Sequence, residues 1–152
     1  MIGDWIDKVE YPQLPAMTEE ELSAFFDQEQ FARLGTFNED GTIHIAPIFF
    51  KFVDGQILMA TQAPSRKIRN IKRNKNVTVL IDNTTVPFKG ALIYGTAELD
   101  FEDVIQKRIG IFRRRLSQED AETYAKRLSS KWQCVIVRIT PTHIASFDYS
   151  KA

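Results

Sequence analysis

Two Asp-Gly pairs, Asp40-Gly41 and Asp54-Gly55, place the tightest constraint on the fold of this chain. Asp-Gly between apolar segments is typical of the short turn that joins neighbouring antiparallel strands. The segments around the two pairs, 32–37, 42–52 and 56–61, each give the signal of a strand. They therefore predict two consecutive hairpins. Because a parallel crossover needs a dozen or more residues, the pattern argues against a doubly wound parallel sheet.

The rest of the chain predicts further strands with helices inserted between them. Strands are expected at 76–82, 89–99 and 134–140, with a short last one at 144–148. Helices are expected at about 18–26, 65–74, 102–116 and 118–128. Thr18 and Glu21 form a capping box at the start of the first helix, and Ser117 is placed to cap the last. Gly90 and Gly95 indicate a bulge, or the close approach of another backbone, within the fifth strand.

This order of elements predicts a mainly β (α+β) protein, with a closed or nearly closed antiparallel barrel and flanking helices. The chain of 152 residues is long enough for one domain with a core. Residues 1–17, which include Pro12 and Pro15, are expected to form an irregular leader. Residues 18–152 are expected to form the single domain.

Composition narrows the classes of partner. The formal net charge is +0, so no bulk attraction to nucleic acid or to anionic membranes is expected. No apolar run approaches the roughly 20 residues of a membrane-spanning helix, and the acidic N-terminal segment does not resemble a secretory signal. The single cysteine, Cys134, rules out an internal disulfide and favours a cytoplasmic location. Its apolar neighbours indicate a buried structural thiol.

The segment 61–73 is a candidate anion site. It predicts the end of a strand, a turn through Pro64 and Ser65, and the start of a basic helix. A helix N-terminus offers free N–H donors and partial positive charge, and an anion there would offset the cations Arg66 and Lys67 in the first turn. The alternative is that these cations only form the solvated face of a surface helix.

Pro47 interrupts the second strand, because proline has no N–H to donate to a ladder. One interpretation is an edge strand or a bulge. The other is that the ladder opens there and leaves backbone groups of Ile48 and Phe49 free for a planar ligand. Trp132, just before the sixth strand, is equally compatible with capping a ligand pocket or covering the core.

The sequence indicates neither a metal site nor a catalytic group. His44 and His143 are the only histidines and lie about 100 residues apart, with no further metal ligands at workable spacing. No Ser/His/Asp signature, Walker-type loop or Gly-x-Gly-x-x-Gly is present. No catalytic acid or base can therefore be nominated.

In their order along the chain, these pieces resemble the pyridoxamine 5'-phosphate oxidase-like family of FMN-binding split β-barrels. The resemblance covers roughly residues 18–148 and is carried by an ordered set of segments: 32–37, 40–50, 57–61, 65–71, 76–82, 90–97 and 137–141. It implies a six-stranded antiparallel split barrel that forms a homodimer, with the cofactor at the subunit interface. FMN is the common cofactor of such proteins, and some branches use the deazaflavin coenzyme.

The resemblance also implies the cofactor-binding residues. Those expected at the cofactor phosphate are Lys67, as the main ligand, with Arg66, Ser65 and Thr61. Those expected along the flavin ring are Pro47, Ile48 and Phe49, with Met59 and Ala60 on the neighbouring strand. Trp132 is expected to reach the cofactor of the partner subunit.

Two departures from the family pattern shape the expected function. True pyridoxamine phosphate oxidases carry an arginine-rich C-terminal strand for the substrate phosphate, whereas residues 145–152 carry no arginine, so vitamin B6 oxidation is not expected. Deazaflavin-using relatives often have a basic residue where this chain has Ser65, which favours FMN. The resemblance thus implies an FMN-dependent oxidoreductase acting on an unidentified small molecule. The alternatives are a deazaflavin-dependent reductase and a non-catalytic flavin-binding protein that acts as a carrier, sensor or storage module.

Overall fold

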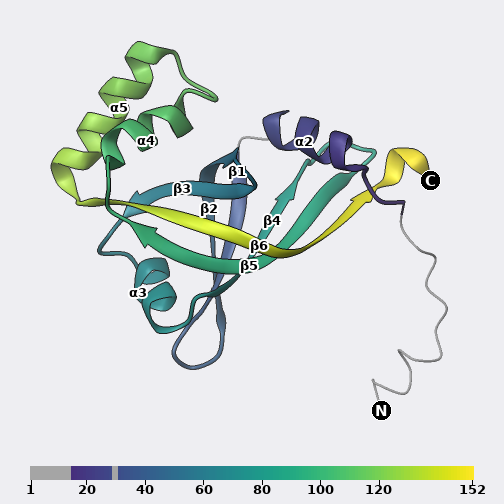
Figure 1. The fold of residues 1–152 in the computed structure, drawn as a ribbon, viewed down its shortest axis with the longest axis horizontal. Coiled ribbons are helices and arrows are strands. Elements are labelled where there is room, and N and C mark those ends of the chain that lie inside the picture. The colour runs from purple at the N-terminus through teal and green to yellow at the C-terminus, as the bar shows by residue number, and fades with distance from the viewer. Residues whose placement is uncertain (1–14, 29–30) are drawn as a thin grey trace.

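The computed structural model describes residues 15–28 and 31–152, and most of the expected leader, residues 1–14, lies outside them. The described chain forms one closed antiparallel barrel in the order β1-β2-β3-β6-β5-β4 (Figure 1). Its strands are β1 (Phe31–Phe37), β2 (Ile43–Val53), β3 (Gln56–Gln62), β4 (Asn76–Asp82), β5 (Lys89–Asp100) and β6 (Cys134–Asp148). The expected six-stranded antiparallel barrel is therefore confirmed, and both Asp-Gly pairs lie at hairpin turns. Gly41 and Gly55 both adopt positive φ, of 88° and 77°.

One strand prediction was wrong. The segments 134–140 and 144–148 are not separate strands but parts of the single strand β6, which pairs with β5 from Ile136 to Asp148. The ladder continues past Pro141 because its register shifts between Tyr94 and Gly95. A Cβ at Gly95 would lie 2.4 Å from the carbonyl oxygen of Thr140, so the backbones approach closely there. The bulge or close approach expected from the glycines is thus present.

The helices begin and end near the predicted residues. They are α2 (Glu19–Gln28), α3 (Arg66–Arg73), α4 (Val104–Phe112) and α5 (Gln118–Lys131). The capping box is formed, because the Thr18 N–H donates to Glu21 Oε1 at 3.1 Å and the Glu21 N–H donates to Thr18 Oγ1 at 3.2 Å. Ser117 caps α5 by accepting from the Asp120 N–H at 3.1 Å. The helix predicted at 102–116 is shorter at both ends in the structure, where α4 runs from Val104 to Phe112.

The helices surround the barrel unevenly. In Figure 1, α4 and α5 pack together at one end, α3 lies below the β3–β6 ribbons and α2 lies above β2 and β4. The barrel interior is filled by aliphatic side chains and phenylalanines, including Phe26 and Phe50. Two smaller apolar clusters lie between α4, α5 and the outside of the barrel, and both reach Phe49. Cys134 is 3% exposed, which confirms the buried thiol, and burial raises its pKa.

Within residues 15–28 and 31–152, no helix combines the length and apolar character that crossing a membrane requires.

Candidate functional site

The site lies where β2 and β3 separate. The two strands pair from Phe50↔Met59 to Val53↔Gln56, and no pairing of β2 with β3 continues from Phe49 back to Ile43. Over that half, β2 pairs with β1 only. The ladder therefore opens close to Pro47 and leaves this half of β2 as a strand edge, a feature that both interpretations of that residue share. The opening exposes a strand edge inside an otherwise closed barrel.

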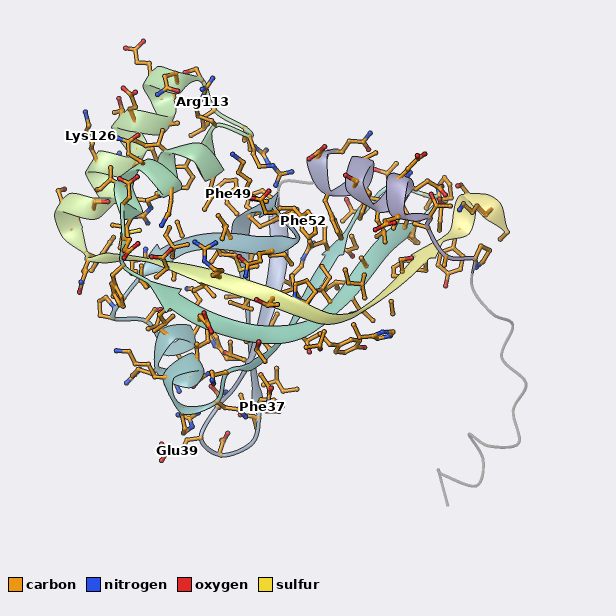
Figure 2. All side chains as sticks on the ribbon, viewed as in Figure 1. Phe37, Glu39, Phe49, Phe52, Arg113 and Lys126 are labelled. Carbon is orange, nitrogen blue, oxygen red and sulfur yellow. The ribbon has the colours of Figure 1, made fainter. Side chains whose placement is uncertain are left out.

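A cavity of about 230 Å³ lies at this opening. Its walls come from β1, β2, β3 and the first turn of α3 on the barrel side, and from α4 and α5 on the other. The lining residues are Phe31, Pro47, Ile48, Phe49, Ala60, Thr61, Gln62, Lys67, Arg108, Phe112, Tyr124 and Leu128. Figure 2 shows Phe49 between the α4–α5 pair and the barrel. The cavity carries two cations and no carboxylate or histidine in its lining.

One end of the cavity is the N-terminus of α3. Ser65 is the N-cap residue, yet its side chain makes no cap hydrogen bond, and its Oγ is buried without a hydrogen-bond partner. Lys67, in the first turn, is half-buried, and burial lowers its pKa. Lys67 makes no ion pair among the described residues. An unpartnered hydroxyl, a desolvated ammonium and a positive helix end together fit a phosphate group.

The buried face of α3 holds that end in place. Ile68 and Ile71 belong to the apolar core of the barrel. Arg73 Nη2, in the last turn, donates to the Phe37 carbonyl at 2.7 Å, which ties the helix to the end of β1. The first turn of α3 therefore cannot shift without disturbing β1 and the core.

The other end of the cavity is aromatic. Phe31 and Phe49 are stacked with ring centroids 4.6 Å apart, and Phe49 meets the edge of Phe112 at 5.6 Å. Tyr124 packs on Phe112 at 5.0 Å. Arg108 lies among these rings, with its guanidinium carbon 5.7 Å from the Phe112 centroid. The walls suit a flat, partly apolar ligand.

Six of the ten predicted cofactor-binding residues line this cavity, namely Pro47, Ile48, Phe49, Ala60, Thr61 and Lys67. The other four do not. Met59 is fully buried in the core, because alternate residues of β3 face opposite sides and Met59 faces inward. Ser65 lies at the adjoining N-cap, Arg66 is exposed on α3, and Trp132 is 45% exposed at the end of α5.

Sequence reasoning missed the α4–α5 wall of the cavity. It nominated none of Arg108, Phe112, Tyr124 and Leu128, nor Phe31 and Gln62 from the barrel side. One signal for Arg108 was present: it stands three residues after Ile105 and four before Phe112, on the apolar face of its helix. A cation on such a face needs either a buried partner or a ligand.

No group of three or more His, Cys, Asp or Glu side chains that could hold a metal ion occurs in the part of the chain that the structure describes.

An antiparallel barrel with one opened ladder and a cation-lined cavity beside it defines a split-barrel protein. The sequence profile of pyridoxamine 5'-phosphate oxidase matches residues 18–147, and the chain belongs to this flavin-binding family. No curated protein sequence matches the chain.

Solved structures share the fold at low sequence identity. A conserved hypothetical protein from Mycobacterium tuberculosis superposes with a TM-score of 0.79 at 23% identity, over 94% of this chain and 92% of that one. An F420 reductase has a TM-score of 0.65 at 18% identity, over 81% and 94% of the two chains. A FAD-binding protein from Mesorhizobium loti has a TM-score of 0.62 at 17% identity, over 88% and 95%.

Proposed function

We propose that the protein binds FMN in this cavity and acts as an FMN-dependent oxidoreductase on a small molecule. The observation that carries the proposal is the unpartnered Ser65 hydroxyl beside the desolvated Lys67 ammonium at the N-terminus of α3. Within residues 15–28 and 31–152 the hydroxyl has no hydrogen-bond partner and the ammonium has no ion pair, and a phosphate would supply one to each. The opened ladder next to them offers room and strand edge for a ring.

The residues of the chain have separate tasks in this proposal. Lys67, Ser65 and the free N–H groups of the first turn of α3 bind the phosphate, and Thr61 and Arg66 lie near enough in sequence to assist. Backbone groups of β2 from Pro47 to Phe49, with Ala60 on β3, orient the ring. Phe112, Tyr124 and Leu128, from α4 and α5, close the cavity on the side away from the barrel. Bound FMN supplies the hydride-transfer chemistry, and the protein supplies position and electrostatics.

A homodimer that completes the site is part of the proposal. A cavity of about 230 Å³ is smaller than the roughly 300–1,000 Å³ typical of ligand sites, so one chain encloses only part of a cofactor. The outer barrel face next to it is apolar and open: Ile43 is 60% exposed and Ile45 66%. Through the strand register Ile45 is in one row with Gly35, Thr78 and Tyr94, so the face spans four strands. Trp132, exposed at the end of α5, is proposed to reach the partner's cofactor.

Two alternatives have a specific observation in their favour. The shared fold of the F420 reductase favours a deazaflavin-dependent reductase, although Ser65 stands where a further basic residue is often found in such proteins. The lack of carboxylates and histidines in the cavity lining favours a flavin-binding protein without turnover.

Two experiments decide among these functions. Parallel titrations with FMN and the deazaflavin coenzyme, followed by absorption, should show tighter binding of FMN. Rapid mixing of the reduced holoprotein with candidate acceptors should show faster reoxidation than free reduced FMN. Tighter binding of the deazaflavin coenzyme would favour the reductase alternative, and no acceleration with any acceptor would favour the non-catalytic one.

A further inference from the structure

Arg108 is a buried cation that the proposed cofactor site does not use. It lies on α4, is 2% exposed and lines the cavity. Its Nε is buried without a hydrogen-bond partner. Its Nη1 makes one long contact, 3.3 Å, to the neutral hydroxyl of Ser129. Among the described residues it makes no ion pair.

Such an arrangement is costly for the protein alone. A guanidinium taken out of water loses its hydration, and a single hydroxyl does not replace it. Buried arginines are normally matched by a carboxylate or a phosphate, whose two oxygens fit the guanidinium fork. The four ion pairs formed among the described residues all use side chains that are at least partly exposed. A ligand anion would therefore satisfy Arg108 where the protein does not.

The residues around Arg108 indicate the chemical character of the rest of the ligand, apart from its anionic group. Phe49, Phe112, Tyr124 and Leu128 line the same part of the cavity. Phe112 packs against both Phe49 and Tyr124, so the wall is largely aromatic. A planar aromatic body fits this wall, and its anionic group would meet the guanidinium.

Arg108 and the proposed phosphate ligands come from different elements. Lys67 and Ser65 belong to the start of α3, whereas Arg108 belongs to α4. Lys67 and Arg108 line the same cavity, so the site carries one cation more than a single phosphate at Lys67 uses.

We propose that Arg108 forms a second anion site in the cavity, which selects small planar aromatic carboxylates as substrates bound beside the cofactor. The proposal rests on the proposed function in taking the same cavity as the FMN site. The carboxylate lies on the Arg108 guanidinium, and the aromatic body lies against Phe112 and Tyr124.

Benzoate and its neutral counterpart benzamide test the proposal. Their affinities are measured by calorimetry, with saturating FMN and without it, for the wild type, Arg108→Met, Arg108→Lys and the control Arg113→Met. Arg113 is exposed at the end of α4 and lies outside the cavity lining, so the control removes the same charge nearby (Figure 2). We expect the wild type and Arg113→Met to bind benzoate about tenfold or more tightly than benzamide with FMN present. Arg108→Met should abolish this preference, and Arg108→Lys should keep part of it.

Thermal unfolding separates binding from structure. Because Arg108 is buried without a carboxylate, Arg108→Met should leave the unfolding midpoint unchanged or raise it. A lowered midpoint together with an unchanged preference for benzoate would mean that Arg108 is only structural, which overturns the proposal. Equal affinities for benzoate and benzamide in the wild type overturn it as well.

Two further outcomes separate this proposal from the proposed function. If FMN displaces benzoate, or if Arg108→Met weakens binding of FMN but not of riboflavin, Arg108 serves the cofactor and the proposal is wrong. If the wild type binds no FMN but prefers benzoate in an Arg108-dependent way, the anion site stands and the proposed cofactor function fails.

Discussion

Asn70 Nδ2 donates a hydrogen bond of 3.0 Å to Thr36 Oγ1, and both side chains are buried between α3 and β1. The same amide also donates to Asn38 Oδ1 at 2.9 Å, and Asn70 Oδ1 accepts from Arg73 Nη2 at 3.1 Å. This small polar network fixes α3 against the end of β1. It thereby sets the position of Lys67, one turn earlier on the same helix.

Asn70→Ala should lower the free energy of unfolding by about 1–3 kcal/mol, because it leaves the buried Thr36 hydroxyl without its partner. It should also weaken FMN binding, although Asn70 does not line the cavity. Urea unfolding and an FMN titration measure the two effects. Arg69→Ala, at an exposed position of the same helix, serves as the control. Equal behaviour of the two variants would contradict the role assigned to the network.

Ser65→Ala should be unusual among N-cap substitutions. Loss of a capping hydroxyl commonly costs about 0.5–2 kcal/mol, but the Ser65 side chain makes no cap hydrogen bond. Without cofactor we therefore expect no loss of stability, and with saturating FMN a smaller rise in melting temperature than in the wild type. Ser117→Ala is the matched comparison, since Ser117 does cap its helix, and it should cost about 1 kcal/mol with or without FMN. A similar loss for both variants without FMN would show that Ser65 is an ordinary cap.

Asp100 ties the base of α4 to the barrel and should make stability depend on pH. Its carboxylate accepts from Lys107 Nζ and from Arg138 Nη2, both at 2.8 Å, and these bonds hold its pKa far below the usual range. The contribution is present above the unfolded pKa of about 3.9 and is lost as pH falls towards the lowered folded value.

Asp100→Asn should therefore be less stable than the wild type at neutral pH and should lose less stability on acidification from about pH 5 to pH 3. Urea unfolding across that interval measures both effects. Asp27→Asn, at an exposed position that makes no ion pair among the described residues, should follow the wild type. Parallel acid profiles for the wild type and Asp100→Asn would contradict the assignment.

Substitution by alanine should change the free energy of unfolding in opposite directions at two of the glycines. A Cβ at Gly95 would lie 2.4 Å from the Thr140 carbonyl oxygen, so Gly95→Ala should destabilise by about 1–3 kcal/mol as overpacking. Gly110 lies inside α4, and a Cβ there would meet only Lys51 Nζ, at 3.9 Å, outside its own helix. Gly110→Ala should stabilise by about 0.5–1 kcal/mol, because alanine has the better helix propensity. Urea unfolding of both variants gives the comparison, and a stable Gly95→Ala would contradict the close approach of β5 and β6.

Local chemistry accounts for the parts of the fold that the sequence predicted. The Asp-Gly turns and the Thr18–Glu21 capping box act within four residues, so their signals do not depend on the rest of the chain. Pro47 also indicated the opening of the sheet. Proline has no backbone N–H to donate, so it fits a strand position at which no ladder hydrogen bond is made. From these the barrel and the β2–β3 opening could be predicted.

The missed parts depend on contacts between distant segments. Arg108 joins the cavity only because α4 packs over β2 and β3, a long-range arrangement that spacing within α4 does not define. Met59 could have been assigned to the core by parity, since it is two residues from Ile57, which also belongs to the core. β6 continues past Pro141 because the register shifts opposite it in β5. A feature of another strand cannot be predicted from the residues around Pro141.

The most direct test of the central claim, that the cofactor phosphate binds at the start of α3, compares FMN with riboflavin. These ligands differ by the phosphate. Their affinities are measured for the wild type, Lys67→Ala and Lys72→Ala, the last at an exposed position of the same helix. We predict that Lys67→Ala weakens FMN binding by about 1.5–3 kcal/mol while riboflavin binding is unchanged, and that Lys72→Ala resembles the wild type. Unchanged FMN affinity in Lys67→Ala, or an equal loss for both ligands, would contradict the claim.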